Sequence, residues 1–146
     1  MGQQQLLLLV LGIVIVGLAV VVGIQAFGEN QKKSNQDALV NDGVRFASDA
    51  QAWGLKPDAF GGGSGSFEGI TWQDLGYEVS GATYVNLNGE WLQPAVSGTG
   101  TTATLLFSGE NVQANNAVSI RVCGMRSSDI RTAVGSITDS PTAPAC

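Results

Sequence analysis

Two cysteines, Cys123 and Cys146, carry the clearest chemical signal in this sequence. With only two cysteines a single pairing is possible. A disulfide would close a loop that ends in a Pro-, Thr- and Ser-rich tail, and would contribute about 3 kcal/mol to stability in the chain-entropy account. Two free thiols are the alternative, but the tail has nothing else to hold it, so we predict the disulfide. The protein would then reside in an oxidising compartment, such as the periplasm or the cell surface.

Catalytic and metal-binding candidates are few. The chain has no histidine, which removes the commonest general base and a common metal ligand. Asp129 and Asp139 lie in the predicted loop, but two isolated carboxylates make a poor calcium site, and Asp37 and Asp42 are expected to be solvated. The run 61–66 (GGGSGS) lacks the Lys and Ser/Thr of a phosphate-binding loop and predicts a flexible connection. We therefore expect no enzymatic activity, no metal and no cofactor.

The element that dominates the sequence is an apolar run from Leu6 to Ile24 without a charged or strongly polar side chain. As a helix it would be about 28 Å long, close to the roughly 30 Å hydrocarbon thickness of a bilayer. The rest of the chain is polar, Gly-rich and mildly acidic, and is long enough for one modest core. A net charge of -5 argues against nucleic acid as the main partner.

Three interpretations compete for this run: a cleaved secretory signal, a permanent single-span anchor, and a helix that lies first in a membrane and later in a filament core. The signal fits poorly, because a basic segment before the run and an A-x-A-like site after it are both missing. The first basic residues, Lys32 and Lys33, follow the run and would place the main domain in the cytoplasm. That placement conflicts with the disulfide. We expect that a short basic leader preceded Met1 and was removed, which resolves the conflict.

The residues at the start of the sequence then give a more specific signal. Met1-Gly2-Gln3-Gln4-Gln5, followed directly by the apolar run from Leu6 to Val16, resembles the start of a mature type IV pilin. The resemblance implies a class III leader cut by prepilin peptidase, N-methylation of Met1, and assembly of the helices into a filament core. The sequence departs from the family in having Gln5 where Glu is usual and Val22 where many pilins have Pro.

The resemblance also suggests which residues serve assembly. Gln5 cannot supply a charge, but it can accept a hydrogen bond from the ammonium group of a neighbouring subunit. The assembly surface is assigned to Gln5 and to the apolar positions Leu6, Leu9, Ile13, Val16 and Val20. Glycines inside the helix cost about 1 kcal/mol each relative to Ala, and they are interpreted as weak points of the helix: Gly12, Gly17 and Gly23.

After the apolar run the pattern becomes amphipathic. Apolar residues recur at steps of three and four, which predicts a helix with one buried face: Leu39, Val40, Val44, Phe46, Ala47, Ala50 and Trp53. Gly54 would stop this helix, and Pro57 follows. The simplest prediction is a single helix from about Gln3 to Trp53, which Gly28 and Gly43 could loosen.

The last part of the sequence predicts an antiparallel sheet. Segments 82–87 and 90–96 flank Asn88-Gly89, a strong hairpin signal, and segments 101–108 and 117–123 are rich in β-branched residues. We expect about four strands in a meander, with a turn at 109–111 and a short helix over 127–134. Thr71 to Asp74 resembles a capping box that starts a helical turn.

These patterns predict an α+β fold in which a long hydrophobic helix continues into an amphipathic half packed on a small antiparallel sheet. The expected parts are a transmembrane or filament-core helix (1–28) and a head (29–146). The head comprises an amphipathic helix (29–53), a Gly-rich loop (54–81), a β-meander (82–123) and a disulfide-closed loop (124–146).

The leading functional hypothesis is the major subunit of an extracellular type IV pilus-like filament. The subunit would be a membrane-embedded precursor that partners with identical copies, prepilin peptidase and the assembly machinery, with no nucleic acid required. A minor pilin or secretion pseudopilin, and a single-span membrane-anchored binding module, are the alternatives.

Overall fold

The computed structural model describes residues 2–139 and 141–146. The chain forms two compact units, Met1–Lys33 and Ser34–Cys146. Helix α1 (Gly2–Leu55) supplies the whole of the described part of the first unit and the first element of the second. The predicted single helix is therefore confirmed, with the α+β class of the fold.

The amphipathic half of α1 forms the helical side of the core. Leu39, Phe46, Ala47 and Ala50 are buried, at the spacing that the sequence predicts. Val44 is 38% exposed, so its assignment to the buried face was wrong. Gly43 was expected to loosen the helix, but the helix runs through it unbroken and Gly43 lies buried against the side chains of Ile120 and Trp91. A side chain at this position would keep the helix from approaching the sheet as closely as it does.

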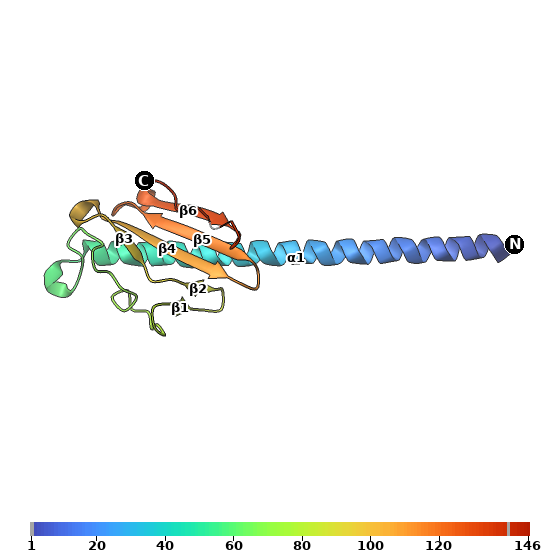
Figure 1. Ribbon diagram of the computed structural model, residues 1–146, viewed down its shortest axis with the longest axis horizontal. Helices are drawn as coiled ribbons and strands as arrows, with labels where there is room; N and C mark the ends of the chain where they lie inside the picture. The colour runs from blue at the N-terminus through green and yellow to red at the C-terminus, as the bar shows by residue number, and fades with distance from the viewer. Residues whose placement is uncertain (1, 140) are drawn as a thin grey trace. The chain divides into compact units, whose positions relative to one another are not determined.

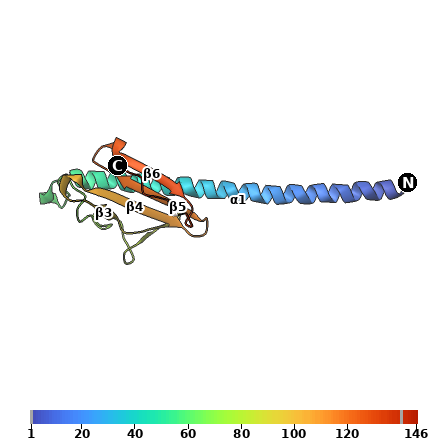
Figure 2. The ribbon, with the colours of Figure 1, turned by 45° about the horizontal axis from the view of Figure 1, so that its top comes forward.

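The sheet has six strands in the part of the chain that the structure describes. Its order is β1-β2-β4-β5-β6, with β3 pairing β4 beside β2, and every pairing is antiparallel. The strands are β1 (Tyr84–Val85), β2 (Glu90–Trp91), β3 (Ala95–Ser97), β4 (Thr104–Asn111), β5 (Asn116–Val122) and β6 (Ile130–Gly135). Figures 1 and 2 show the second half of α1 lying across one face of this sheet.

The core between helix and sheet is strongly aromatic. Phe46 projects from α1 and makes edge-on contacts with Trp72, Tyr77, Tyr84 and Trp91, at centroid distances of 5.1, 5.0, 5.6 and 4.9 Å. Edge-to-face contacts of this kind contribute about 0.5–1.5 kcal/mol each beyond the burial of apolar area. Phe46 is therefore the residue around which the head packs.

Three details of the predicted sheet were wrong. Residues 109–111 lie inside β4, and the turn follows them, because Asn115 takes the left-handed conformation that closes it. The segment 127–134 is a 3-10 turn, η3 (Ser127–Asp129), followed by strand β6, in which Val134 pairs with Val118. The expected strand 90–96 is divided into β2 and β3, which pair with different parts of β4.

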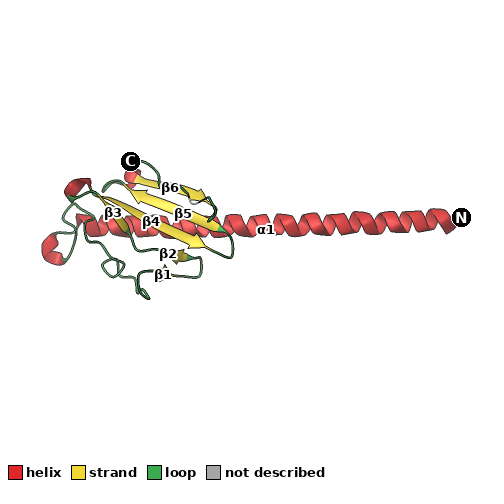
Figure 3. Ribbon diagram, viewed as in Figure 1, coloured by secondary structure: helices red, strands yellow, loops and turns green. Residues whose placement is uncertain are grey.

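The Gly-rich segment after α1 has a definite structural role. Figure 3 shows it as loop apart from the short 3-10 helix η1 (Asp58–Phe60). The N–H groups of Gly63 and Gly65 donate to the carbonyls of Trp53 and Gly54, at 3.1 and 2.6 Å. These are carbonyls of the last turn of α1, which have no partner within the helix. The loop therefore caps the helix, and Gly54, expected to stop it, lies buried within α1.

Candidate functional site

The candidate assembly surface is the apolar half of α1. Its side chains are exposed all around the helix, from Leu6 at 65% to Val20 at 55%, and no residue of the most apolar stretch is buried. By length and composition α1 is the one helix of the described chain that could cross a membrane. A helix that is apolar on every side needs an apolar environment on every side.

The predicted assembly residues all lie on this exposed surface. Gln5 is exposed, with the apolar positions after it: Leu6, Leu9, Ile13, Val16 and Val20. Gly12, Gly17 and Gly23 have no atom within 4 Å of the position that a Cβ would take, so each leaves a shallow notch in the helix surface. Helices can approach closely at such notches. Met1, the predicted site of processing and N-methylation, lies outside the described residues.

The second feature of the site is the disulfide-closed loop. Cys123 and Cys146 are joined as predicted, with their Cα atoms 5.7 Å apart. The C-terminal tail, which the disulfide holds at its end, lies against the outer face of the sheet, the face away from α1. There the Ser119 hydroxyl donates to the carbonyl of Pro141, at 3.1 Å. Ser119 is buried although its strand position faces outward, which shows that the tail covers β5.

The loop is also fastened to α1. Gln51 is buried, and its side-chain nitrogen donates to the carbonyls of Gly124 and Arg126, both at 2.7 Å. One amide group thus satisfies two backbone acceptors that follow the disulfide. Sequence reasoning missed Gln51, because a polar residue on the helix gives no signal of what it faces.

A hydrogen-bonded phenol ties another segment of the head to α1. The Tyr77 hydroxyl donates to the Asp49 carboxylate at 2.6 Å, which ties the segment after Trp72 to α1. Burial, and then the bond to Asp49, raise the pKa of Tyr77 to about 12. The phenol therefore remains protonated and serves as a donor over the whole physiological range.

Asp42 is not solvated as expected. Its Oδ2 accepts from the side-chain amides of Asn86 and Asn88, at 2.8 and 2.7 Å. The predicted hairpin at Asn88-Gly89 is confirmed, and its turn is closed by a bond from Asn86 N–H to the Gly89 carbonyl at 3.0 Å. Asp42 thus fastens the hairpin to α1.

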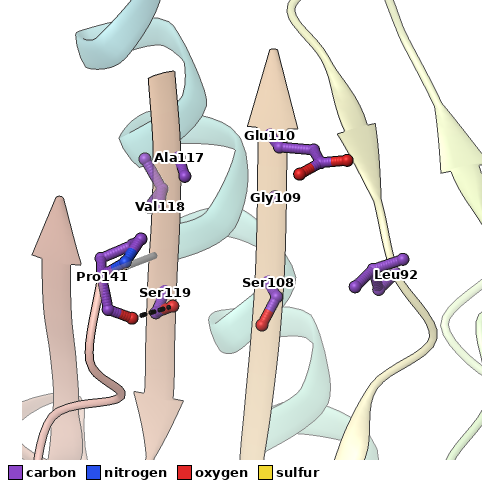
Figure 4. Close-up of a pocket in the computed structure, with 8 residues that line it drawn as sticks. All are labelled: Leu92, Ser108, Gly109, Glu110, Ala117, Val118, Ser119 and Pro141. Atoms are coloured by element: carbon purple, nitrogen blue, oxygen red, sulfur yellow. Dashed lines mark hydrogen bonds between the residues drawn. The ribbon is translucent and has the colours of Figure 1, made fainter. Parts of the chain in front are cut away.

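The outer face of the sheet carries a shallow groove of about 160 Å³. Figure 4 shows its eight residues, with Leu92 and Glu110 on one side and Pro141 on the other. Ser108 and Ser119 place hydroxyl groups along the floor, on β4 and β5. The groove therefore combines one carboxylate and two hydroxyls with apolar walls.

The residues that the sequence analysis considered for metal or phosphate binding have other partners in the structure. Within residues 2–139 and 141–146, no three acidic, histidine or cysteine side chains gather into a metal site. Asp129 accepts from the Arg126 N–H, and Asp139 accepts from the Ser136 hydroxyl. In the Gly-rich run, the N–H groups of Gly63 and Gly65 already bind helix carbonyls, so these two donors are not free to hold a phosphate.

The structure is compatible with a pilin-like architecture, because it combines a long apolar helix, an antiparallel sheet and a disulfide. Comparison of the chain with known protein families, with curated proteins and with solved structures finds no significant match.

Proposed function

We propose that this chain is the structural subunit, a major pilin, of an extracellular type IV pilus-like filament. The observation that carries the proposal is the apolar half of α1, which is exposed on all sides. Large exposed apolar surfaces in soluble proteins mark sites of membrane or protein interaction. A membrane before assembly and the helices of identical subunits after it would cover this surface in turn.

Continuity between the apolar helix and the head favours a filament subunit over a simple anchor. α1 passes from its apolar half into residues that form the core of the head, among them Leu39 and Phe46. A plain anchor needs only a tether to its domain. Here the element that would assemble also organises the fold of the head, as a repeated structural subunit requires.

Assembly would replace lipid contacts by contacts between helices. Lipid and a helix bundle are similarly apolar, so the gain comes from close packing and from polar pairing more than from the hydrophobic effect. Gln5 would supply the polar pairing by accepting a hydrogen bond from the terminal ammonium group of a neighbouring subunit. The notches at Gly12, Gly17 and Gly23 would let the helices of neighbouring subunits approach closely.

The test is electron microscopy of filaments sheared from the native cell, with mass spectrometry of the purified subunit. We expect filaments composed mainly of this chain, with an N-methylated Met1. A scarce component of such filaments would indicate a minor pilin instead. A head that stays membrane-anchored and monomeric, with no filament, would refute the proposal.

Substitutions at Gln5 test separately the proposed hydrogen bond between Gln5 and a neighbouring subunit. Gln5→Leu should impair assembly, because it leaves a neighbour's amine without an acceptor, whereas Gln5→Glu should be tolerated. Gln25→Leu is the matched control, since it makes the same change on the same helix beyond the apolar run. Normal filament yield from Gln5→Leu would exclude this role for Gln5 and leave the filament proposal standing.

A further inference from the structure

The outer face of the sheet carries two pairs of like charges in direct register. Glu90 on β2 lies opposite Glu110 on β4, and Arg121 on β5 lies opposite Arg131 on β6. The residues next to them, Trp91 and Val122, are buried on the inner face. Because side chains alternate between the faces of a strand, all four charges belong to the outer face.

Each pair is unfavourable for the isolated subunit. Like charges directly opposite each other destabilise a sheet. In the described part of the chain none of the four side chains has an ion pair or a hydrogen bond that would offset this repulsion. Arg121 is half-buried, and its Nε is a buried donor without a partner. A buried unpaired donor is costly, and this cost adds to the repulsion between the two arginines in the isolated subunit.

The two pairs cannot neutralise each other within one subunit. Arg121 lies beside Leu106 on β4, four residues along that strand from Glu110. Four residues of extended chain span about 13 Å, which exceeds the screening length of about 8 Å at physiological ionic strength. The opposite charges therefore neutralise each other little within one subunit, whereas a second copy of the chain could bring them into contact.

The groove beside Glu110 offers space for a long cationic side chain. Leu92 and Pro141 form apolar walls, which suit the methylene stem of an arginine. The carboxylate of Glu110 and the hydroxyl oxygens of Ser108 and Ser119 are acceptors, and a guanidinium group has five N–H donors to satisfy. Shape and charge thus match an arginine of a second copy.

We propose that the arginine pair of one subunit, Arg121 and Arg131, binds the glutamate pair of the next, Glu90 and Glu110, with Arg131 entering the groove beside Glu110. The two surfaces differ, so the contact is heterologous: each copy uses one surface as donor and the other as acceptor. A heterologous contact that does not close into a ring generates an open polymer. The inference rests on the proposed filament and names the contact between its heads.

Charge reversal in the full-length chain tests this contact. Both the double variant E90R/E110R and the double variant R121E/R131E place like charges together between subunits, and each should lower the yield of sheared filaments at least about tenfold. The quadruple variant E90R/E110R/R121E/R131E restores opposite charges in every contact and should recover most of the yield. D58R/E78R is the matched control: it changes the net charge as E90R/E110R does, at exposed positions outside both pairs, and should assemble normally.

A second variant guards against misfolding as an explanation. Arg131→Lys keeps the charge and introduces an amine that carbodiimide can join to a carboxylate. In assembled filaments it should produce a ladder of covalent oligomers, which disappears when Glu110→Gln is added. Unimpaired filaments from both double variants, failure of the quadruple variant to recover, or absence of the ladder would each overturn the contact. If the wild-type chain formed no filament at all, the proposed function itself would fail.

Discussion

Gly43→Ala is the substitution for which the structure gives the sharpest expectation. A Cβ at Gly43 would overlap the Cδ1 of Ile120 and would lie 2.7 Å from the Cη2 of Trp91. Ile120 and Trp91 are both fully buried, so neither side chain has free space to move into. The helix must then move away from the sheet, or the core must repack.

Two effects of known size oppose each other in this variant. Replacing Gly by Ala inside a helix is favourable by about 1 kcal/mol. Overpacking a core costs about 1–3 kcal/mol, and contact with two immobile side chains places Gly43 near the upper end of that range. We expect a net loss of about 1–2 kcal/mol in the free energy of unfolding.

Urea unfolding of the full-length chain in detergent micelles, followed by tryptophan fluorescence, measures this loss. All three tryptophans lie in the unit Ser34–Cys146, so their fluorescence reports on the head. Gly54→Ala is the matched control on the same helix. Its Cβ would lie 2.6 Å from the Cε of Met125, the flexible end of a half-buried side chain that can move aside. We expect Gly54→Ala to cost less than Gly43→Ala.

A double-mutant cycle identifies the cause. Ile120→Val removes the methyl group that the new Cβ would overlap, and alone it should cost about 0.5–1.5 kcal/mol. Combined with Gly43→Ala, it should cost at least about 1 kcal/mol less than the sum of the two single changes. Strict additivity, or a Gly43→Ala variant more stable than the wild type, would refute the argument from close approach.

Three further predictions concern the fastenings of the head. The pKa of Tyr77 is raised from 10.0 to about 12, so the protonated phenol contributes fully to stability below pH 10, and this contribution is lost as the pH rises from 10 toward 12. Unfolding measured over that pH range should show the loss of stability, and the Tyr77→Phe variant should not show it. Reducing the disulfide, or Cys146→Ser, should lower the free energy of unfolding by about 3 kcal/mol in denaturant titrations; an unchanged midpoint would show that the tail is held by other contacts. Gln51→Leu should cost about 1–3 kcal/mol, because it leaves two carbonyls without their donor, while the exposed Gln113→Leu should change stability little; equal effects of the two would contradict the role given to Gln51.

Features set by local pattern were predictable from the sequence. The helix follows from apolar spacing, the hairpin from Asn88-Gly89, and the disulfide from a cysteine count that allows one pairing. Each of these signals is contained in a short stretch of chain or in the number of cysteines. They were sufficient for the fold class and for the assembly surface as a candidate.

Features set by long-range pairing were not predictable. Strand β6 was mistaken for a helix because the local residues around Thr132 and Ala133 allow either structure, and pairing with β5 decides. The role of Gly43 depends on Ile120 and Trp91, which are distant in sequence. The like-charge pairs were invisible for the same reason: opposition of Glu90 and Glu110 exists only once the strand register is known.

The way in which the head is fastened separates its stability from its assembly. Its pieces are joined by neutral donors: Gln51 binds the carbonyl of Gly124 in the loop. Asn88 of the hairpin and Tyr77 of the segment after Trp72 donate to carboxylates of α1. None of these contacts is an ion pair, so salt should screen them little. The proposed contact between subunits depends on attraction between opposite charges on exposed or half-buried side chains. Added salt weakens such attraction, because it shortens the screening length, which is about 8 Å at physiological ionic strength. Raising the ionic strength should therefore weaken filaments while leaving the urea midpoint of the detergent-solubilised subunit nearly unchanged. If both declined together, the division between internal and external contacts would be wrong.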